Sequence, residues 1–210
     1  EGIHAVEAAL DAGRVVDITA ERRRAERTDV GRVVAKAVDA NIPVEYVDDV
    51  RPMAATQAPQ GLVARARPIE PVTIDAALTL AAPAALLVVD HVEDPRNIGA
   101  AARSAYAAGM TAIVVSDKRS APLGATAFKA AVGALEHLPI VVVSSIPEAL
   151  KRLGKNGVWT VGLDGEATTS LLGLELLDQP VALCIGAEGA GLSHLVAERW
   201  AVLATIPMVG

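Results

Sequence analysis

The arrangement of the whole chain is decided by one stretch, Asp90-His-Val-Glu-Asp-Pro-Arg-Asn-Ile-Gly-Ala-Ala-Ala-Arg-Ser-Ala105. It follows the aliphatic run Ala84-Ala-Leu-Leu-Val-Val89, which is typical of a strand buried on both faces. Pro95 and Asn97 are typical of a helix entry, and residues 100–108 are rich in helix formers. In open α/β sheets ligands bind at the carboxyl ends of strands, so this polar loop is a candidate site.

Each polar residue of this stretch also has a simpler interpretation. Asp94 and Asn97 fit a role as helix caps, and Arg103 fits a solvated helix face two turns further on. For any one of them alone, that interpretation is favoured. The density of polar groups between two apolar elements favours a site instead.

The second half of the chain alternates apolar runs with helical segments, which predicts an α/β fold with a mostly parallel sheet covered on both faces. The predicted strands are residues 84–89, 111–115, 139–143, 158–161, 181–185 and 201–206. The predicted helices are residues 97–108, 124–133, 146–153 and 192–199.

The first half predicts a smaller α/β unit, residues 1–67, followed by a linker, residues 68–83, that begins and ends with proline. A catalytic domain over residues 84–210 completes the predicted organisation. Within the linker, the amphipathic stretch 72–80 fits a short surface helix. The elements predicted in the first unit are helix 2–10, strand 14–19, helix 30–40, strand 42–47 and strand 61–66.

The densest basic cluster of the chain lies in the first unit and contains Arg22, Arg23, Arg24 and Arg27. Two interpretations stay open: a patch that contacts phosphates, or a solvated face with charges of both signs. The formal net charge of −6 argues against binding nucleic acid by overall charge. Any RNA contact must therefore be local.

Composition excludes several classes of protein. No apolar run is long enough to span a membrane and no secretory signal is recognisable, so we expect a cytoplasmic protein. The single cysteine, Cys184, lies in an apolar run and is expected in the core. The four histidines have no ligand spacing, so no metal site is expected.

A second candidate site is the glycine-rich turn Ile185-Gly-Ala-Glu-Gly-Ala-Gly-Leu-Ser193. Glycines let a backbone approach a ligand, and freed N–H groups can bind its polar atoms. By itself the signal is weak, because the spacing is not the dinucleotide fingerprint and no acidic residue follows about twenty positions later.

Together, the two candidate sites resemble a known family. The pattern Asp-x-Val-x-Asp-Pro-x-Asn-x-Gly-x-x-x-Arg-Ser-Ala resembles the first signature of the SpoU family of RNA 2′-O-ribose methyltransferases, within the knotted SPOUT superfamily. Gly-x-Glu-Gly-x-Gly-Leu resembles the second signature, and Ala204-Thr-Ile-Pro-Met-Val-Gly210 resembles the start of the third. In the family the third signature continues into a Ser and an Asn of the active site. This sequence stops before these residues, so we expect it to be part of a longer protein.

The first unit is similar to the substrate-binding domain of the family's ribosomal-RNA branch. Gly2-Ile-His-Ala-Val6 and Gln60-Gly-Leu-Val-Ala64 carry the likeness. Pro59 stands where that branch usually has a His, which puts in doubt any RNA contact made by that side chain.

The resemblance implies a parallel sheet with a C-terminal deep trefoil knot, preceded by a small L30e-like α/β domain. It further implies S-adenosylmethionine as cofactor and a homodimer formed through the catalytic domain. Gly186 and Ile206 would contact the cofactor through backbone groups, with Gly162, Leu163 and Gly189 as further candidates. The segment from Leu163 to Glu166 also fits a plain turn.

The resemblance identifies Arg103 as the catalytic arginine, Asn97 as a residue that orients it or the substrate, and Glu188 as a loop-holding or substrate-placing residue. Because a guanidinium is effectively always protonated, Arg103 is expected to grip a phosphate and stabilise the developing alkoxide. A carboxylate such as that of Glu188 is the better proton acceptor, if one is needed.

The first 67 residues resemble the layout of family members that methylate a guanosine in large-subunit ribosomal RNA, and this resemblance implies 23S rRNA as substrate, with tRNA second. Two rival classes are a nucleotide-binding oxidoreductase and a non-catalytic RNA-binding module. The presence of Asn97, Arg103 and Glu188 argues against the second rival.

Overall fold

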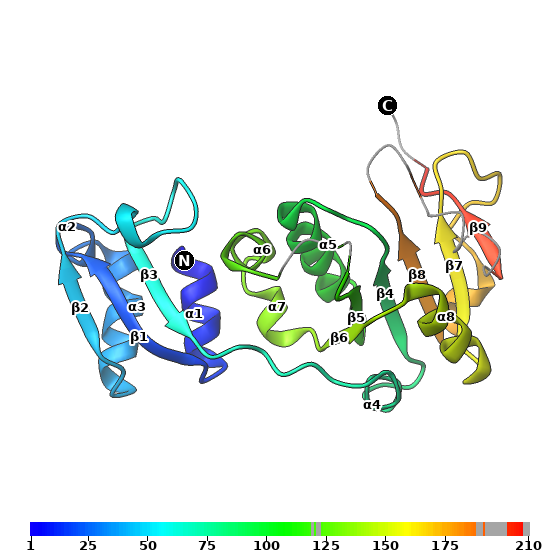
Figure 1. The fold of residues 1–210 in the computed structure, drawn as a ribbon, viewed down its shortest axis with the longest axis horizontal. Coiled ribbons are helices and arrows are strands. Elements are labelled where there is room, and N and C mark those ends of the chain that lie inside the picture. The colour runs from blue at the N-terminus through cyan, green and yellow to red at the C-terminus, as the bar shows by residue number, and fades with distance from the viewer. Residues whose placement is uncertain (119, 121–122, 188–190, 192–200, 208–210) are drawn as a thin grey trace.

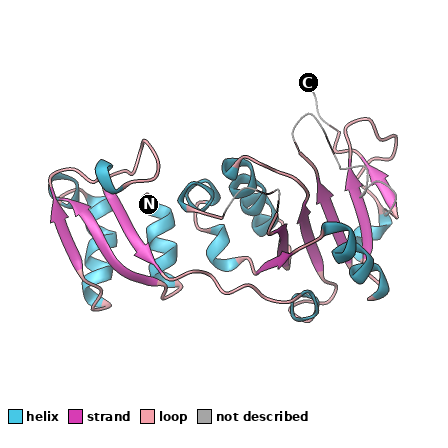
Figure 2. Ribbon diagram, in the orientation of Figure 1, coloured by secondary structure: helices cyan, strands magenta, loops and turns pink. Residues whose placement is uncertain are grey.

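A computed structural model of the chain describes residues 1–118, 120, 123–187, 191 and 201–207 (Figure 1). The N-terminal sheet consists of β1 (Val15–Glu21), β2 (Val44–Val47) and β3 (Leu62–Ala66), in the order β2-β1-β3. Strand β1 pairs parallel with β2 and antiparallel with β3. The N-terminal unit is therefore a small mixed sheet that is separate from the second sheet (Figure 2).

Helices of the N-terminal unit cover its sheet because each carries an aliphatic stripe. Helix α1 (Ile3–Asp11) buries Val6 and Ala9, and α3 (Thr28–Asp39) buries Val30 and Val33 against the sheet residue Ile18. The apolar positions recur three or four residues apart, which places them on one helix face. The two short elements are α2 (Arg22–Ala25) and the 3₁₀ helix η1 (Arg51–Met53).

The second sheet, as far as the chain is described, has six strands in the order β6-β5-β4-β8-β7-β9, and all its ladders are parallel. Its strands are rich in Val, Ile and Leu because a parallel sheet is buried on both faces. They are β4 (Ala85–Val89), β5 (Ala112–Ser116), β6 (Ile140–Val143), β7 (Trp159–Leu163), β8 (Val181–Ile185) and β9 (Val202–Ala204).

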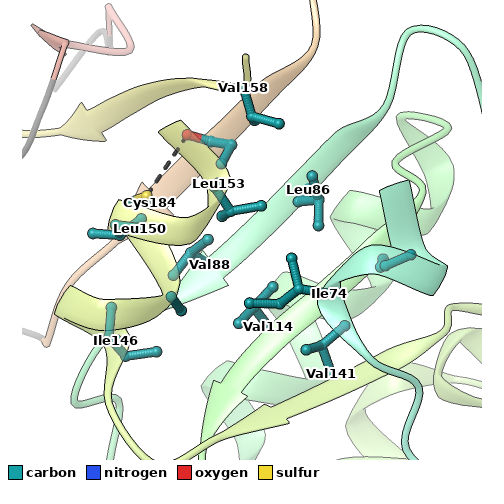
Figure 3. Packing of buried hydrophobic residues seen from close by; sticks show 14 of the residues in the cluster. Ile74, Leu86, Val88, Val114, Val141, Ile146, Leu150, Leu153, Val158 and Cys184 are labelled. Carbon is teal, nitrogen blue, oxygen red and sulfur yellow. Dashed lines mark hydrogen bonds between the residues drawn. The ribbon is translucent and has the colours of Figure 1, made fainter. Parts of the chain in front are cut away.

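Two apolar cores lie on opposite faces of this sheet. On one face, Leu86 and Val88 pack with α4 (Ile74–Leu78) and α8 (Ile146–Lys155), as Figure 3 shows. On the other face, the alternating residues Leu87 and Val89 pack with a second helical layer. That layer consists of α5 (Pro95–Ala107), α6 (Ala125–Ala131) and α7 (Ala134–His137); the remaining short element is the 3₁₀ helix η2 (Glu175–Asp178).

All six predicted strands of the second half are confirmed, β8 with the predicted bounds and the others with ends shifted by at most two residues. The last is shorter than predicted, since β9 covers Val202–Ala204 only. The helix predicted over residues 192–199 lies outside the described residues. The short helix predicted within residues 72–80 is α4, and its Ala77 is fully buried on the second sheet. Cys184 is fully buried, as predicted, and burial raises the pKa of its thiol.

The two units contact each other through α1 on one side and α6 on the other, and Arg14 contacts α7 (Figure 1). Arg14 donates two hydrogen bonds of 2.7 Å to the carboxylate of Glu136, whose side chain is only 1% exposed. The Arg14 guanidinium also lies 5.2 Å from the centre of the Phe128 ring. Lys129 donates a hydrogen bond of 2.9 Å to the Thr56 hydroxyl. These contacts join residues that are far apart in sequence.

No helix within the described part of the chain is long and apolar enough to cross a membrane.

Candidate functional site

The two candidate sites begin on neighbouring strands. Strands β4 and β8 pair in parallel, with Val89 opposite Ile185. One residue later, the backbone N–H of Asp90 donates a 2.9 Å hydrogen bond to the Ile185 carbonyl. The polar loop after β4 and the glycine-rich turn after β8 therefore start side by side, at the carboxyl edge of the sheet.

Helix α5 begins with a side-chain cap. The Asp94 carboxylate accepts a 2.8 Å hydrogen bond from the backbone N–H of Arg96, and the Arg96 guanidinium pairs with it at 2.7 Å. The hydrogen bond from the Arg96 side chain and that from its backbone N–H lower the pKa of Asp94. The interpretation of Asp94 as a helix cap is thus confirmed, whereas Asn97 lies in the first turn and is not the cap.

Arg103 lies two turns into α5, on its exposed face. The opposite face of the helix is fixed by Ile98, Ala102 and Ala105, which are buried in the core. Among the described residues, nothing forms a hydrogen bond or ion pair with the Arg103 guanidinium. A rigid helix therefore presents a free cation to solvent, and Asn97 lies half-buried one and a half turns before it.

The residues predicted to hold a cofactor end three parallel strands. Gly162 pairs with Cys184 on β8 and with Leu203 on β9, and Leu163 pairs with Ala204. Strands β7, β8 and β9 run in the same direction (Figure 1), so Leu163, Gly186 and Ile206, at or just after their ends, lie at one edge of the sheet. Among them, Ile206 is 48% exposed. The structure thus brings Gly162, Leu163, Gly186 and Ile206 together.

After β8, the backbones of Ala187 and Gly191 pair with each other. The backbone N–H of Ala187 donates to the Gly191 carbonyl at 3.0 Å, and the N–H of Gly191 donates to the Ala187 carbonyl at 2.9 Å. Gly191 has a φ of +66°, which favours glycine. Glu188 and Gly189, predicted as site residues, lie outside the described residues.

The segment after β7 forms a turn as well. The backbone N–H of Asp164 donates to the Ala204 carbonyl at 3.0 Å, and the Asp164 carboxylate accepts a 2.9 Å hydrogen bond from the Glu166 N–H. The plain-turn interpretation of this segment therefore describes its geometry.

The basic cluster of the N-terminal unit divides into paired and unpaired arginines. Arg24 pairs with Glu21 at 2.9 Å, and Arg22 donates a 3.2 Å hydrogen bond to the Tyr46 carbonyl. The guanidinium groups of Arg23 and Arg27 are exposed and form no hydrogen bond or ion pair with any described residue. Two of the four predicted RNA-binding arginines are thus free to bind phosphate.

The two N-terminal motifs meet in space. The Ile3 N–H donates a 3.1 Å hydrogen bond to the Gln60 side chain, and the Gly2 N–H donates to the Leu62 carbonyl at 3.2 Å. At Gly61, whose φ is +81°, a Cβ atom would lie 2.2 Å from the Arg24 side chain. Glycine at position 61 is therefore favoured both by its backbone conformation and by the packing of Arg24.

Sequence reasoning missed a pair at the end of β4. Nδ1 of His91 lies 2.5 Å from Oδ1 of Asp90, whose residue is 0% exposed. Periodicity carries no information on such a contact. The only signal was the position of two polar residues directly after a buried strand.

A metal centre finds no support in the described part of the chain, which contains no group of three His, Cys, Asp or Glu residues able to hold an ion.

Comparison with known proteins covers both halves of the chain. Residues 84–210 match the model described as SpoU rRNA Methylase family, and residues 1–72 match the model described as RNA 2′-O ribose methyltransferase substrate binding. A 23S rRNA (guanosine-2′-O-)-methyltransferase RlmB of Xylella fastidiosa strain Temecula1 is 37% identical over 98% of this chain and 78% of its own length.

Two further relatives extend this result. The protein of the same name from Xylella fastidiosa strain 9a5c is 46% identical over 127 residues, which span 60% of this chain and 51% of that protein. A crystal structure of an AdoMet-bound rRNA methyltransferase from Sinorhizobium meliloti has a TM-score of 0.70 and 25% identity, and the match covers 100% of this chain and 78% of that one. Signatures, fold and relatives agree, and the chain belongs to the SpoU rRNA methylase family.

Proposed function

We propose that the protein transfers a methyl group from S-adenosylmethionine to a ribose 2′-hydroxyl in RNA, at a guanosine of 23S rRNA. One observation carries the proposal: the two signature segments start on adjacent strands, joined by the hydrogen bond from Asp90 to Ile185. Relatives named for methylation of a 23S rRNA guanosine support the choice of reaction and substrate.

The carboxyl edge of β7, β8 and β9 fits S-adenosylmethionine in its chemistry. It offers the backbone groups of Gly186, directly after β8, and the exposed apolar side chain of Ile206, two residues after β9. Ligand sites combine such apolar surface with a few fixed polar groups. Gly162, Leu163 and Gly189 complete the proposed cofactor set. The bound sulfonium would supply an electrophilic methyl group.

The residues of the first signature bind and orient the RNA. Arg103 grips a phosphate and stabilises negative charge on the attacking oxygen, because its guanidinium stays protonated and has no partner among described residues. Asn97 orients Arg103 or the ribose from the first turn of the same helix. Glu188 holds the glycine-rich turn against the substrate. Fixing the reacting groups in line removes much of the barrier to transfer.

The finer architecture is proposed from the family. Residues 1–67 form an L30e-like RNA-binding domain, 68–83 the linker, and 84–210 the catalytic domain, whose C-terminal segment forms the trefoil knot. Two catalytic domains form a homodimer. Light scattering at working concentration tests the dimer, and a fully active monomer would contradict it. Since 23S rRNA is assembled into ribosomes in the cytoplasm, the proposed substrate locates the reaction there.

The N-terminal unit supplies RNA recognition through phosphate contacts. Arg23 and Arg27 have free guanidinium groups in the described part of the chain and are the strongest candidates, with Arg22 and Arg24 beside them. Phosphate contacts position an RNA and do not identify a base. The choice of guanosine therefore depends on the relatives alone.

The direct experiment uses labelled S-adenosylmethionine with 23S rRNA and, separately, tRNA, both lacking native modification. We expect label in 23S rRNA, at a 2′-O-methylguanosine. Label in tRNA alone would overturn the substrate and keep the reaction, and label in neither RNA would overturn both. Binding of NAD instead of S-adenosylmethionine in a thermal-shift assay would favour an oxidoreductase. A chain that lacks residues 1–67 should bind the cofactor but not methylate 23S rRNA.

A further inference from the structure

The backbone of His91 adopts a conformation that side chains rarely take. Its φ is +57°, in the left-handed region where a residue with a Cβ atom is disfavoured. Strain of this kind persists where the surroundings hold a residue in place, and it is found most often at functional sites.

A buried carboxylate fixes the orientation of the imidazole. Asp90 is fully buried, and its Oδ1 lies 2.5 Å from Nδ1 of His91. A neutral imidazole carries its proton on one nitrogen and accepts through the other. An ionised carboxylate accepts hydrogen bonds only, so a neutral imidazole bonded to it through Nδ1 carries its proton there and keeps a lone pair on Nε2.

The free nitrogen is accessible. The His91 side chain is 36% exposed, and the described residues offer no second hydrogen bond to its ring. His91 directly follows Asp90, whose backbone N–H donates to the Ile185 carbonyl. Ile185 in turn directly precedes Gly186. His91 therefore lies at the edge where the two signature segments start.

Two other groups of the first signature, the Asp94 carboxylate and the Arg103 guanidinium, are poorer proton acceptors. The Asp94 carboxylate is held by Arg96, which lowers its pKa and hence its basicity. Arg103 has no lone pair available, because a guanidinium stays protonated. Among these neighbours, only the imidazole combines an accessible lone pair with a fixed counter-ion.

We infer that His91, oriented by Asp90, accepts the proton of the ribose 2′-hydroxyl during methyl transfer. This inference rests on the proposed function. Nε2 takes the proton as the hydroxyl oxygen forms its bond to the methyl carbon. The carbon–sulfur bond breaks, its electron pair stays on the sulfur, and the imidazolium that forms is stabilised by the Asp90 carboxylate, as in a catalytic triad.

The test compares single-turnover methylation by the wild type and by His91→Gly. Glycine suits a φ of +57°, so this variant should fold at least as well as the wild type. We expect the rate to fall at least about 100-fold, the low end for loss of a general base, and to recover in part on adding imidazole. S-adenosylmethionine affinity by calorimetry should not change. His137→Ala, at an exposed histidine that stacks on Tyr106, is the matched control and should keep the wild-type rate.

A second readout is independent of activity. Nitrogen NMR of the ligand-free protein at mildly alkaline pH should find the His91 proton on Nδ1. A proton on Nε2, or a His91→Gly variant that methylates at the wild-type rate, would overturn the inference. A wild-type protein that methylates no RNA would overturn the proposed function instead, whereas the NMR result would still report on the pair.

Discussion

Two helices of this protein present arginines to solvent, and they do so in different ways. Helix α5 has four buried residues that fix it on the second sheet, and its Arg103 lies two turns into the helix, on the exposed face. Helix α2 is four residues long and has no buried residue. Two of its arginines have partners within their own unit. The difference separates two tasks: a rigid helix at a strand end can position a charge for chemistry, whereas a surface turn can only attract phosphates.

The largest expected effect comes from removing the charge on α5. Arg103→Ala should lower the single-turnover rate of methylation by about 100- to 1000-fold, as for loss of one group that stabilises developing negative charge. The unfolding temperature should not change, because the side chain is exposed and contacts no described partner. Arg103→Lys keeps the positive charge but loses the planar guanidinium, so its methylation rate should lie between those of the wild type and Arg103→Ala. Wild-type turnover in Arg103→Ala would remove α5 from the mechanism.

The next effect concerns the interface between the two units. Arginines of α2 can guide RNA to α5 only while the two units keep a fixed relative orientation. Arg14→Ala leaves the Glu136 carboxylate buried without its partner, which should cost about 3–5 kcal/mol in the free energy of unfolding. The double variant Arg14→Met with Glu136→Leu should regain most of it, since an apolar pair needs no counter-charge. Denaturant unfolding measures the free energy of unfolding of both variants. An equal loss of stability in the single and the double variant would contradict a role for the charge pair.

A smaller effect is expected on α2 and the residue that precedes α3. Arg23→Ala with Arg27→Ala should weaken RNA binding, and the slope of log K against log salt should fall by about 0.7–0.9 for each phosphate that the protein no longer neutralises. Arg22→Ala with Arg24→Ala is the matched control, since both guanidiniums are already engaged by Tyr46 and Glu21. A larger loss of RNA affinity in the control variant would contradict the assignment of Arg23 and Arg27 as the phosphate-binding arginines.

The smallest effect concerns Cys184, which lies on β8 two residues before Gly186 but belongs to the core. Burial raises the pKa of its thiol, so the folded protein should react slowly with a thiol reagent until it unfolds. Above the ordinary pKa of 9.0 the unfolded chain loses this proton while the folded chain keeps it. Stability should therefore fall as pH rises through this range, and Cys184→Ala should remove that part of the slope. Fast labelling of the folded protein would contradict its burial.

Elements of secondary structure were predictable from the sequence, whereas long-range contacts were not. Aliphatic runs such as residues 84–89 and 181–185 report burial directly, so their strands were predictable, as was the burial of Cys184. The placement of β4 between β5 and β8 depends on long-range packing and cannot be read from periodicity. The pair of Arg14 and Glu136 joins residues 122 positions apart.

At the candidate site, the signature motifs identified which loops meet and left their geometry open. Asp94 was predicted as a possible cap from its type and position, and the structure confirms it. The left-handed backbone of His91 had no signal, because the residue there is not glycine. The division of four similar arginines into paired and free groups depends on Glu21, three residues before Arg24, and on Tyr46, which comes near Arg22 only in the folded chain.

The most direct test of the division between α5 and α2 measures two quantities for two variants on one 23S rRNA fragment: the dissociation constant for RNA and the single-turnover rate at saturating RNA. We expect a crossed result. Arg103→Ala should lose rate with a nearly unchanged dissociation constant, and Arg23→Ala with Arg27→Ala should lose affinity with a nearly unchanged rate. If both variants lose the same quantity, the separation of chemistry on α5 from RNA binding around α2 is wrong.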